Sequence, residues 1–306
     1  MDVWIPERTR AAHRAQLPEG IAVHDLAGDG PLPEQLGDCD FFVAALDTQR
    51  VIDAMPRFSG LQVVQSLNAG VEGLVDHIPA GVTLCDGSGI PDIGVAEWVV
   101  MVMLAMRRRM SSYIDAQRAA RWQPGPWPAG GDDLDGATVL IVGYGSIGRV
   151  LEQRLTAFGA RVERVARRPR AGVHGADALP ALLPAADVVV ILLPVTPSTR
   201  GFVDAAFLAA MRRGALLVNA SRGAVVDTGA LVAALHDGHV TAALDVTDPE
   251  PLPGGHPLWS APGVLITPHV AGSVRAWSAR AWRFTGEQVQ RFVRGEPLLN
   301  RVDDGY

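Results

Sequence analysis

The amino-acid sequence predicts an α/β protein of two domains, in which a doubly wound parallel sheet is inserted into a second α/β layer. Three observations support this prediction. An apolar run that ends in three glycines begins only near Val139 of the 306 residues. Strand-like and helix-like segments alternate after that run as far as Ile266. Short apolar segments already precede the run, so the later sheet begins after another layer has started.

The part of the chain before the glycines is expected to form the first layer. Short apolar runs between polar segments predict strands at residues 3–5, 21–24, 41–45, 63–66 and 82–85. A long helix is expected from about residue 93 to 119. The loop that follows, residues 122–131, is rich in Trp, Pro and Gly, which predicts a crossing between domains or an arm.

The part of the chain from residue 137 onward is expected to form the inserted sheet. Strands are predicted at residues 138–142, 161–166, 188–192, 215–219, 241–245 and 264–266, with helices at 146–158, 204–211 and 228–236. A last helix is expected at about 274–294 and can return to the first layer. The expected domains are therefore 1–92 with 275–306, and 93–274.

Composition and charge narrow the class of protein. Hydrophobic residues make up 48% and charged residues 20%, as in ordinary globular proteins. The net charge of −6 gives no support for nucleic-acid binding, although a cleft can still focus positive charge on an acidic substrate. Cys39 and Cys85 lack metal-ligand spacing and are too few for a disulfide framework, so we expect buried thiols and no metal site.

The N-terminal residues and the apolar runs bear on location. The first six residues lack the basic region and apolar core of a signal peptide. Apolar runs stay shorter than the roughly 18 residues that a membrane span needs. The expectation from the sequence is a cytoplasmic protein without membrane contact.

The glycines at 143, 145 and 148 predict a dinucleotide site. A strand is expected before them and a helix after them, which is the context that this spacing needs. Gly143 would allow the tight turn, Gly145 would let the backbone approach a pyrophosphate, and Gly148 would let helix and strand pack closely. The helix N-terminus would add unpaired N–H groups that favour phosphate.

The end of the second strand of this sheet predicts the choice of cofactor. Enzymes that use NAD usually place Asp or Glu there to bind the ribose 2′-hydroxyl. Here the end falls near Ala166, Arg167 and Arg168, and a guanidinium can bind a 2′-phosphate with two hydrogen bonds. We therefore expect NADP(H) to be preferred over NAD(H). Two alternatives stay open: a solvated basic turn, or binding of the ribose by Glu163, which we place in mid-strand.

Three later segments predict the chemistry. They read LVNASRG at 217–223, ALDVTDPEP at 243–251 and LITPHVAG at 265–272. Each begins with a predicted strand and places a polar residue beyond it, namely Arg222, Glu250 and His269. Arginine can bind the carboxylate of a 2-oxo acid and polarise its carbonyl. Histidine can exchange the hydroxyl proton, and a carboxylate beside it stabilises imidazolium.

With these motifs together, the chain resembles the D-isomer-specific 2-hydroxyacid dehydrogenase family, which includes D-lactate, glycerate and phosphoglycerate dehydrogenases and glyoxylate/hydroxypyruvate reductases. Further segments that resemble the family are SLNAGVEG at 66–73, VAEW at 95–98 and LLPVTPSTRG at 192–201. The resemblance covers nearly the whole chain. It implies a Rossmann domain inserted into a flavodoxin-like substrate domain.

The resemblance also implies roles for individual residues. Arg222 would hold the carboxylate and carbonyl of the substrate, His269 would be the general acid in reduction, and Glu250 its partner. Backbone N–H groups near Ala69 and Gly70 would bind the substrate carboxylate, and Asp245 would bind the nicotinamide carboxamide. The cofactor-binding residues expected are Gly143, Gly145, Ser146, Ile147, Gly148, Arg167, Arg168, Leu193, Pro194, Thr199, Ala220, Asp245 and Gly272.

Family members also suggest a homodimer built on the helix that begins near Val95 and on the arm ending at Gly131. Trp122 or Trp127 of one copy would then reach the other copy's active site. The small residue followed by arginine after the second strand resembles the NADPH-using glyoxylate/hydroxypyruvate reductases. These features predict a reductase of small 2-oxo acids that gives D-2-hydroxy acids.

Alternative functions remain open on the sequence. One is a dehydrogenase-like binding protein that senses the cofactor, and another is a sister activity such as phosphite oxidation. Formate oxidation is disfavoured, because formate dehydrogenases of this superfamily carry glutamine where Glu250 stands. Residues 86–91 match no particular substrate subgroup, so the sequence does not select one 2-oxo acid.

Overall fold

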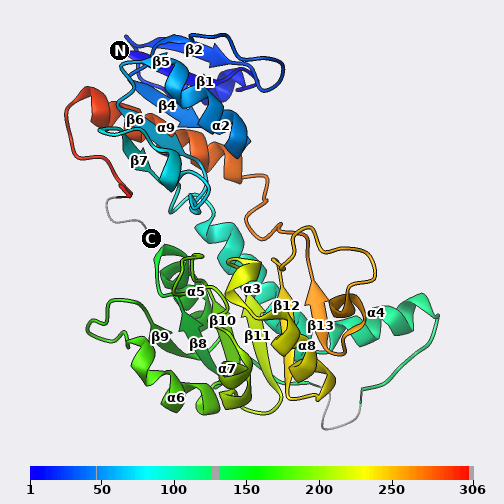
Figure 1. Cartoon of the computed structure of the whole chain (residues 1–306). Coiled ribbons are helices and arrows are strands. Elements are labelled where there is room, and N and C mark those ends of the chain that lie inside the picture. The colour runs from blue at the N-terminus through cyan, green and yellow to red at the C-terminus, as the bar shows by residue number, and fades with distance from the viewer. Residues whose placement is uncertain (46, 126–130, 303–306) are drawn as a thin grey trace. The chain divides into compact units, whose positions relative to one another are not determined.

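The computed structural model describes residues 1–45, 47–125 and 131–302 (Figure 1). The chain divides into two compact units, each described separately below. Unit 1 consists of Met1–Pro91 and Arg275–Tyr306, and unit 2 of Asp92–Val274. Both units are built on parallel sheets, so the predicted α/β class is confirmed.

Unit 1 contains a sheet of five parallel strands in the order β2-β1-β4-β6-β7. Its strands are β1 (Asp2–Pro6), β2 (Ala22–Leu26), β4 (Phe41–Ala44), β6 (Val63–Ser66) and β7 (Thr83–Cys85). A short parallel pair, β3 (Gly37–Asp38) and β5 (Phe58–Ser59), lies outside this sheet. The helices are α1 (Ala11–Arg14), α2 (Thr48–Ala54) and α9 (Trp277–Val293). This strand order is that of flavodoxin-like folds, as expected.

The central strand β4 shows why both faces of the unit 1 sheet are covered. Its four residues are all buried, and successive side chains point to opposite faces. Phe41 packs in the cluster that contains Trp282 of α9, whereas Phe42 packs in the cluster that contains Val51 of α2. The apolar residues on both faces therefore require a helix layer on each side.

Unit 2 contains a sheet of six parallel strands in the order β13-β12-β11-β10-β8-β9. The strands are β8 (Thr138–Val142), β9 (Arg161–Val165), β10 (Val188–Ile191), β11 (Ala215–Asn219), β12 (Val240–Leu244) and β13 (Val264–Ile266). The helices are α3 (Asp92–Arg107), α4 (Met110–Arg118), α5 (Ser146–Ala157), α6 (Leu179–Leu182), α7 (Ala205–Ala210) and α8 (Thr228–His236). The strand order reverses between β8 and β10, and ligands of such sheets bind at the carboxyl ends of the strands at this point.

Among the residues that the structure describes, the outer edge of the unit 2 sheet, beyond β9, carries a single parallel bridge, between Val165 and His174. The strand that follows β9 in many dinucleotide-binding sheets is therefore reduced here to one bridged residue. The segment that joins β9 to this bridge contains the arginines that follow β9 in the sequence.

The two faces of the unit 2 sheet bury alternate residues of each strand. Leu140 packs on the face that α7 and α8 cover, and Val139 packs on the face that α3 and α5 cover. Complete burial of an aliphatic side chain contributes roughly 1.5–3 kcal/mol, so β8 and β10 are stabilised from both sides. Aspartate side chains begin two of the covering helices, since Asp204 accepts from the amide of Phe207 and Asp227 from that of Ala230.

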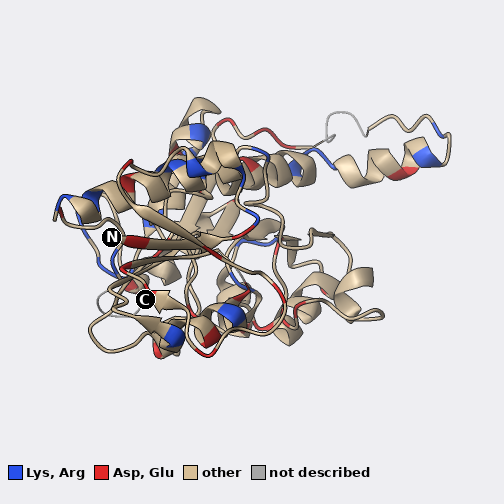
Figure 2. Ribbon diagram, turned by 90° about the horizontal axis from the view of Figure 1, so that it is seen from above, with Lys and Arg blue, Asp and Glu red and all other residues tan. Residues whose placement is uncertain are grey.

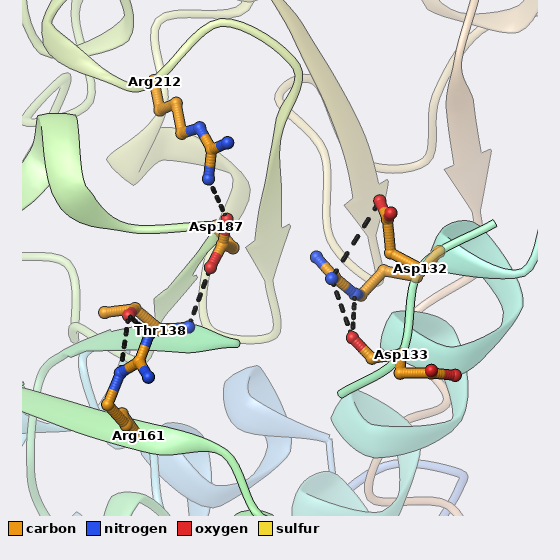
Figure 3. Close-up of polar contacts among 7 residues, drawn as sticks. Asp132, Asp133, Thr138, Arg161, Asp187 and Arg212 are labelled. Carbon is orange, nitrogen blue, oxygen red and sulfur yellow. Dashed lines mark hydrogen bonds and ion pairs between the residues drawn. The ribbon is translucent and has the colours of Figure 1, made fainter. Parts of the chain in front are cut away.

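The prediction of a single long helix at 93–119 is wrong, because the structure has two helices there, α3 and α4. Arg109 lies between them with φ of 56°, in the left-handed region. The carbonyl of Arg107 accepts from the amide of Asp132 at 3.0 Å, and its guanidinium donates twice to the carbonyl of Asp133, at 2.8 and 3.1 Å. The segment that contains Asp132 and Asp133 (Figure 3) thus donates to the Arg107 carbonyl, which a continuous helix would use as an acceptor for its own next turn.

Among the described residues, no helix is both long enough and apolar enough to cross a membrane.

Candidate active site

The glycine turn lies where β8 meets α5, as predicted. Gly143 has φ of 102°, and a Cβ atom there would stand 2.5 Å from the carbonyl oxygen of Leu192. Only glycine permits both this conformation and the close approach of the β8 and β10 ends. The amides of Gly143 and Tyr144 both donate to the carbonyl of Val165, at 2.9 and 3.0 Å. The turn is therefore fixed against both neighbouring strands.

The space beside Gly145 fits the expected approach of a ligand. Among the described residues, no heavy atom beyond the chain neighbours lies within 4 Å of a Cβ placed on Gly145. Gly145 is also the residue that precedes α5, so the first amides of a 12-residue helix begin beside this open space. Such a helix N-terminus favours phosphate. The donor set therefore fits a dinucleotide pyrophosphate.

Ser146 has a partner that the sequence did not indicate. Its hydroxyl lies 3.3 Å from Oδ1 of Asp92, the first residue of α3, and this aspartate is 4% exposed. The contact joins the start of α5 to the start of α3. Only the long-range packing of α3 against α5 brings the two residues together.

Arg167 and Arg168 follow the end of β9 and are exposed. Glu163, the alternative ribose ligand, lies in the middle of β9 opposite Leu140, and its carboxylate is 3.4 Å from Nε2 of His174. The carboxylate is thus placed in mid-strand, as expected, and directed toward a histidine of the adjoining bridge.

A cluster beside the glycine turn joins Tyr144 to two charged residues. The hydroxyl of Tyr144 donates to Glu152 of α5, and Glu152 also accepts from Arg164 of β9. The hydrogen bond from Arg164 holds the pKa of Glu152 below its usual value of 4.5. Burial, with Glu152 as the next cause, raises the pKa of Tyr144. The charge of Arg164 is therefore compensated locally.

The remaining expected cofactor residues follow the ends of the next strands. Leu193 and Pro194 come after β10, in a loop that closes on itself because the hydroxyl of Thr199 donates to the carbonyl of Pro194 at 2.6 Å. Ala220 follows β11, and Gly272 lies in the loop after β13. Ile147 stands in the first turn of α5. All of these positions are at the carboxyl edge of the six-stranded sheet.

Arg222 lies just beyond β11, in a loop fixed by the buried side chain of Asn219. Oδ1 of Asn219 accepts from the amide and the hydroxyl of Ser221, at 3.1 and 2.8 Å. Nδ2 of Asn219 donates to the carbonyl of Arg222 at 2.9 Å. Asn219 is fully buried, and the sequence analysis assigned it no role. It therefore fixes the backbone on both sides of the Arg222 amide.

Glu250 and His269 are in contact, as predicted for a proton-transferring pair. Nδ1 of His269 lies 2.6 Å from Oε1 of Glu250, and their side chains are 50% and 40% exposed. A carboxylate only accepts hydrogen bonds, so Nδ1 carries the proton of this contact. The other ring nitrogen, Nε2, is then left as the atom that can exchange a proton with a substrate.

The backbone of His269 has φ of 55°, an uncommon value for a residue other than glycine. Asp245 holds this conformation, because its carbonyl accepts from the His269 amide at 2.7 Å. Its buried carboxylate accepts from the amides of Val270 and Ala271 and from the hydroxyl of Thr267, at 2.9, 2.8 and 2.5 Å. Backbone strain of this kind persists where surrounding contacts enforce it. In this structure Asp245 orders the loop that carries His269.

The loops that carry Arg222 and Glu250 approach each other closely. A Cβ atom on Gly223 would stand 2.0 Å from the carbonyl carbon of Thr247, so only glycine fits there. The strands that precede these loops, β11 and β12, are neighbours in the sheet. The structure thus gathers the three expected catalytic residues on adjoining loops of unit 2.

Ala69 and Gly70 belong to unit 1, in the loop after β6. The hydroxyl of Ser66 accepts from the amide of Asn68 at 3.0 Å, and the carbonyl of Asn68 accepts from the amide of Gly87 at 2.8 Å. These bonds order the start of the loop. Both expected substrate-binding positions are partly buried.

A cavity of about 350 Å³ lies among Arg107, Asp132, Asp187 and Thr241. Asp132 and Asp187 precede strands β8 and β10, and Thr241 lies at the start of β12, so the cavity is at the amino edge of the six-stranded sheet. Arg107, the last residue of α3, borders the cavity as well. The predicted catalytic and cofactor residues do not line it. The chemistry is therefore to be sought at the opposite, carboxyl edge.

Comparison with known proteins agrees with this geometry. Residues 100–271 match the family described as D-isomer specific 2-hydroxyacid dehydrogenase, NAD binding domain. A glyoxylate/hydroxypyruvate reductase A of Serratia proteamaculans is 36% identical over 69% of this chain and 71% of its own length. The fold and the site together define an NAD(P)-dependent oxidoreductase. The chain belongs to the D-isomer specific 2-hydroxyacid dehydrogenase family.

Solved structures extend the similarity to the whole chain. A D-isomer specific 2-hydroxyacid dehydrogenase from Xanthobacter autotrophicus, in complex with NADPH and MES, is 34% identical with a TM-score of 0.83, over 99% of this chain and 97% of that one. An NADPH-dependent glyoxylate/hydroxypyruvate reductase from Sinorhizobium meliloti, in complex with NADP and sulfate, is 29% identical with a TM-score of 0.82, over 99% and 98%. The predicted fold is confirmed.

Proposed function

We propose that this protein reduces small 2-oxo acids to D-2-hydroxy acids and prefers NADPH as its cofactor. The observation that carries the proposal is the contact between His269 and Glu250. Arg222 lies on an adjoining loop at the same carboxyl edge of the six-stranded sheet. A histidine paired with a carboxylate can protonate a carbonyl oxygen, and an adjacent guanidinium can bind a carboxylate and stabilise developing negative charge. A 2-oxo acid presents both groups on neighbouring carbons.

In this proposal each residue of the site has a separate role. NADPH, when bound, supplies the hydride. Arg222 binds the substrate carboxylate and polarises the carbonyl, with the amides near Ala69 and Gly70 as further carboxylate donors. His269 delivers its proton from Nε2 to the carbonyl oxygen, while Glu250 stabilises the charged imidazole until that transfer. Asp245 keeps the His269 loop in place.

The preference for NADPH rests on the residues after β9. Arg167 and Arg168 are exposed there, and a carboxylate at that position would repel a 2′-phosphate. Guanidinium groups bind phosphate with paired, charge-assisted hydrogen bonds. The complexes of the two similar structures with NADPH and NADP support this preference.

A panel of substrates tests the proposal. Glyoxylate, hydroxypyruvate, pyruvate and bulkier 2-oxo acids are each offered with NADPH and with NADH, and cofactor oxidation is followed. We expect turnover with at least one small 2-oxo acid, faster with NADPH at low cofactor concentration. Tight cofactor binding without turnover of any of these acids would instead favour a binding protein.

We further propose that the protein is a homodimer through α3, α4 and the arm that follows them. In unit 2, α4 extends away from the six-stranded sheet (Figures 1 and 2). Met101, Met110 and Ile114 on these helices are 52%, 47% and 39% exposed, and Trp122 is 94% exposed. Trp127 and part of the arm lie outside the described residues. Exposed apolar patches of this kind mark protein interfaces. Sedimentation of the wild type and of Met110→Glu tests the dimer: the wild type should sediment as two copies and the variant as one.

A further inference from the structure

Two glutamine side chains face each other in the interior of unit 1. Gln65 lies in β6 and Gln288 in α9, and both are fully buried. Nε2 of Gln288 donates to Oε1 of Gln65 at 2.8 Å, although 223 residues separate the two in the chain. A buried amide is costly unless its polar atoms are paired, so the other partners of this pair show which segments it holds together.

The amide nitrogen of Gln65 joins the ends of two neighbouring strands. Nε2 donates to the carbonyl of Ser66, the last residue of β6, at 2.8 Å, and to the carbonyl of Asp86, just after β7, at 3.0 Å. These two acceptors take both protons of the nitrogen. Because β6 and β7 are parallel neighbours (Figure 1), the segments that follow them, residues 67–73 and 86–91, leave the sheet at the same edge.

The two segments also contact each other directly. The amide of Gly87 donates to the carbonyl of Asn68 at 2.8 Å, and a Cβ atom on Gly87 would stand only 2.5 Å from the carbonyl oxygen of Leu67. Leu67 and Asn68 immediately precede Ala69 and Gly70. A shift of the segment after β7 therefore moves the backbone that leads into the expected substrate-binding positions.

Residues after α9 fix the segment after β7 as well. Gln288 exchanges two hydrogen bonds with the backbone of Leu299, both at 2.9 Å. The carbonyl of Asn300 accepts from the amide of Asp86 at 3.0 Å, and its Nδ2 donates to the carbonyl of Ser88 at 2.8 Å. Asn300 has φ of 53°, an uncommon conformation that persists where surrounding contacts enforce it. The glutamine pair and Asn300 thus form one clamp on the two segments.

We propose that Gln65, Gln288 and Asn300 are positioning residues for the carboxylate of the substrate. They act through the backbone, because the clamp sets where the segment 67–73 presents Ala69 and Gly70. The inference rests on the proposed function, in which that segment binds the carboxylate of a 2-oxo acid.

The clamp predicts a separation of kinetic constants. The substrate carboxylate is bound both before and during hydride transfer, so a displaced segment should raise KM and leave kcat nearly unchanged. The residues expected to bind NADPH belong to unit 2, so the affinity for NADPH should stay the same.

The test compares Gln288→Met and Asn300→Gly with Thr285→Val as the matched control. Methionine is unbranched like glutamine but lacks its amide, and glycine tolerates the φ of position 300 while it removes only the side chain. Thr285 lies in the same helix as Gln288 and is also fully buried, but its hydroxyl donates to the carbonyl of Ala281 within that helix, at 2.9 Å. All three variants lose side-chain hydrogen bonds, but only the first two loosen the clamp.

Steady-state kinetics with the best 2-oxo acid of the panel, and calorimetric titration of NADPH, are carried out on each full-length variant. Gln288→Met is expected to raise KM about tenfold and Asn300→Gly about threefold, because the first loses more hydrogen bonds. Thr285→Val should change neither KM nor kcat. If Gln288→Met does not fold, Asn300→Gly decides, because that variant keeps the backbone hydrogen bond between position 300 and Asp86.

The possible failures are distinguishable. Turnover by the wild type, with the same KM in the folded clamp variants, would overturn only the positioning role. An equal rise of KM in Thr285→Val, or a matching loss of NADPH affinity, would also overturn it, because either result indicates a general loss of structure. A wild type that turns over no 2-oxo acid would refute the proposed function, and the positioning role would fall with it.

Discussion

Nδ1 of His269 lies 2.6 Å from Oε1 of Glu250, although the two residues follow different strands of the unit 2 sheet. Two loops must be ordered independently for this contact to form. The His269 loop is held by Asp245, and the Glu250 loop passes Gly223 at a distance that excludes any side chain there. The pair is therefore a product of the sheet edge and not of a local sequence turn.

Glu250→Gln is the first prediction from this pair. The amide keeps a hydrogen-bonding oxygen but loses the charge that stabilises imidazolium, so kcat for a 2-oxo acid should fall by about 10–100-fold. The affinity for NADPH should not change. Steady-state kinetics and cofactor titration on one preparation measure both quantities. An unaltered kcat would show that the carboxylate is not the partner of the acid.

Gly145→Ala and Gly143→Ala separate cofactor binding from folding. Gly145 has φ of −99° and open space beside it, so alanine is expected to fold normally there but to obstruct the approach of the pyrophosphate. Thermal unfolding should be unchanged, and NADPH binding should be lost. At Gly143 a methyl group would collide with the Leu192 carbonyl, so the melting temperature itself should drop.

A Gly145→Ala protein that binds NADPH like the wild type would move the dinucleotide site away from this turn. The Gly143→Ala variant is the comparison that calibrates the unfolding assay, because both substitutions add the same methyl group.

The cluster of Glu152, Arg164 and Tyr144 predicts a dependence of stability on acid. Arg164 lowers the pKa of Glu152 below 4.5 in the folded state, so this contact stabilises the protein above that pH. The stabilisation should disappear as the pH falls through the lowered value. Glu152→Gln should therefore unfold at a lower temperature than the wild type at neutral pH.

The gap in melting temperature between Glu152→Gln and the wild type should narrow as the pH falls below 4.5. It should close once the pH has passed the lowered pKa, where the carboxylate of the folded wild type becomes protonated. Thermal unfolding of both proteins over a pH series measures this gap. A gap that stays constant into strong acid would show that the ionised form of Glu152 makes no contribution.

Much of the fold could be predicted from the sequence because the central strands are buried on both faces. The strands at 63–66, 138–142, 215–219 and 264–266 have the expected bounds, since each contains consecutive apolar residues and is followed by polar or turn residues. The break between α3 and α4 could not be predicted. It depends on Asp132 reaching the carbonyl of Arg107, which is a contact between segments distant in the sequence.

The site shows the same division. Motif spacing identified Arg222, Glu250 and His269, because each follows a recognisable strand. It gave no role to Asn219, whose hydrogen bonds fix the Arg222 loop. A signal for Asn219 was available in the sequence, because it is a polar residue at the end of a buried strand.

The most direct test of the account is the effect of His269→Ala on chemistry and on cofactor binding, measured together. If His269 donates the proton to the substrate carbonyl, kcat for the best 2-oxo acid should fall by about 10²–10⁴-fold, while NADPH binds as tightly as before. The same kcat in the variant and the wild type would contradict the proposed mechanism.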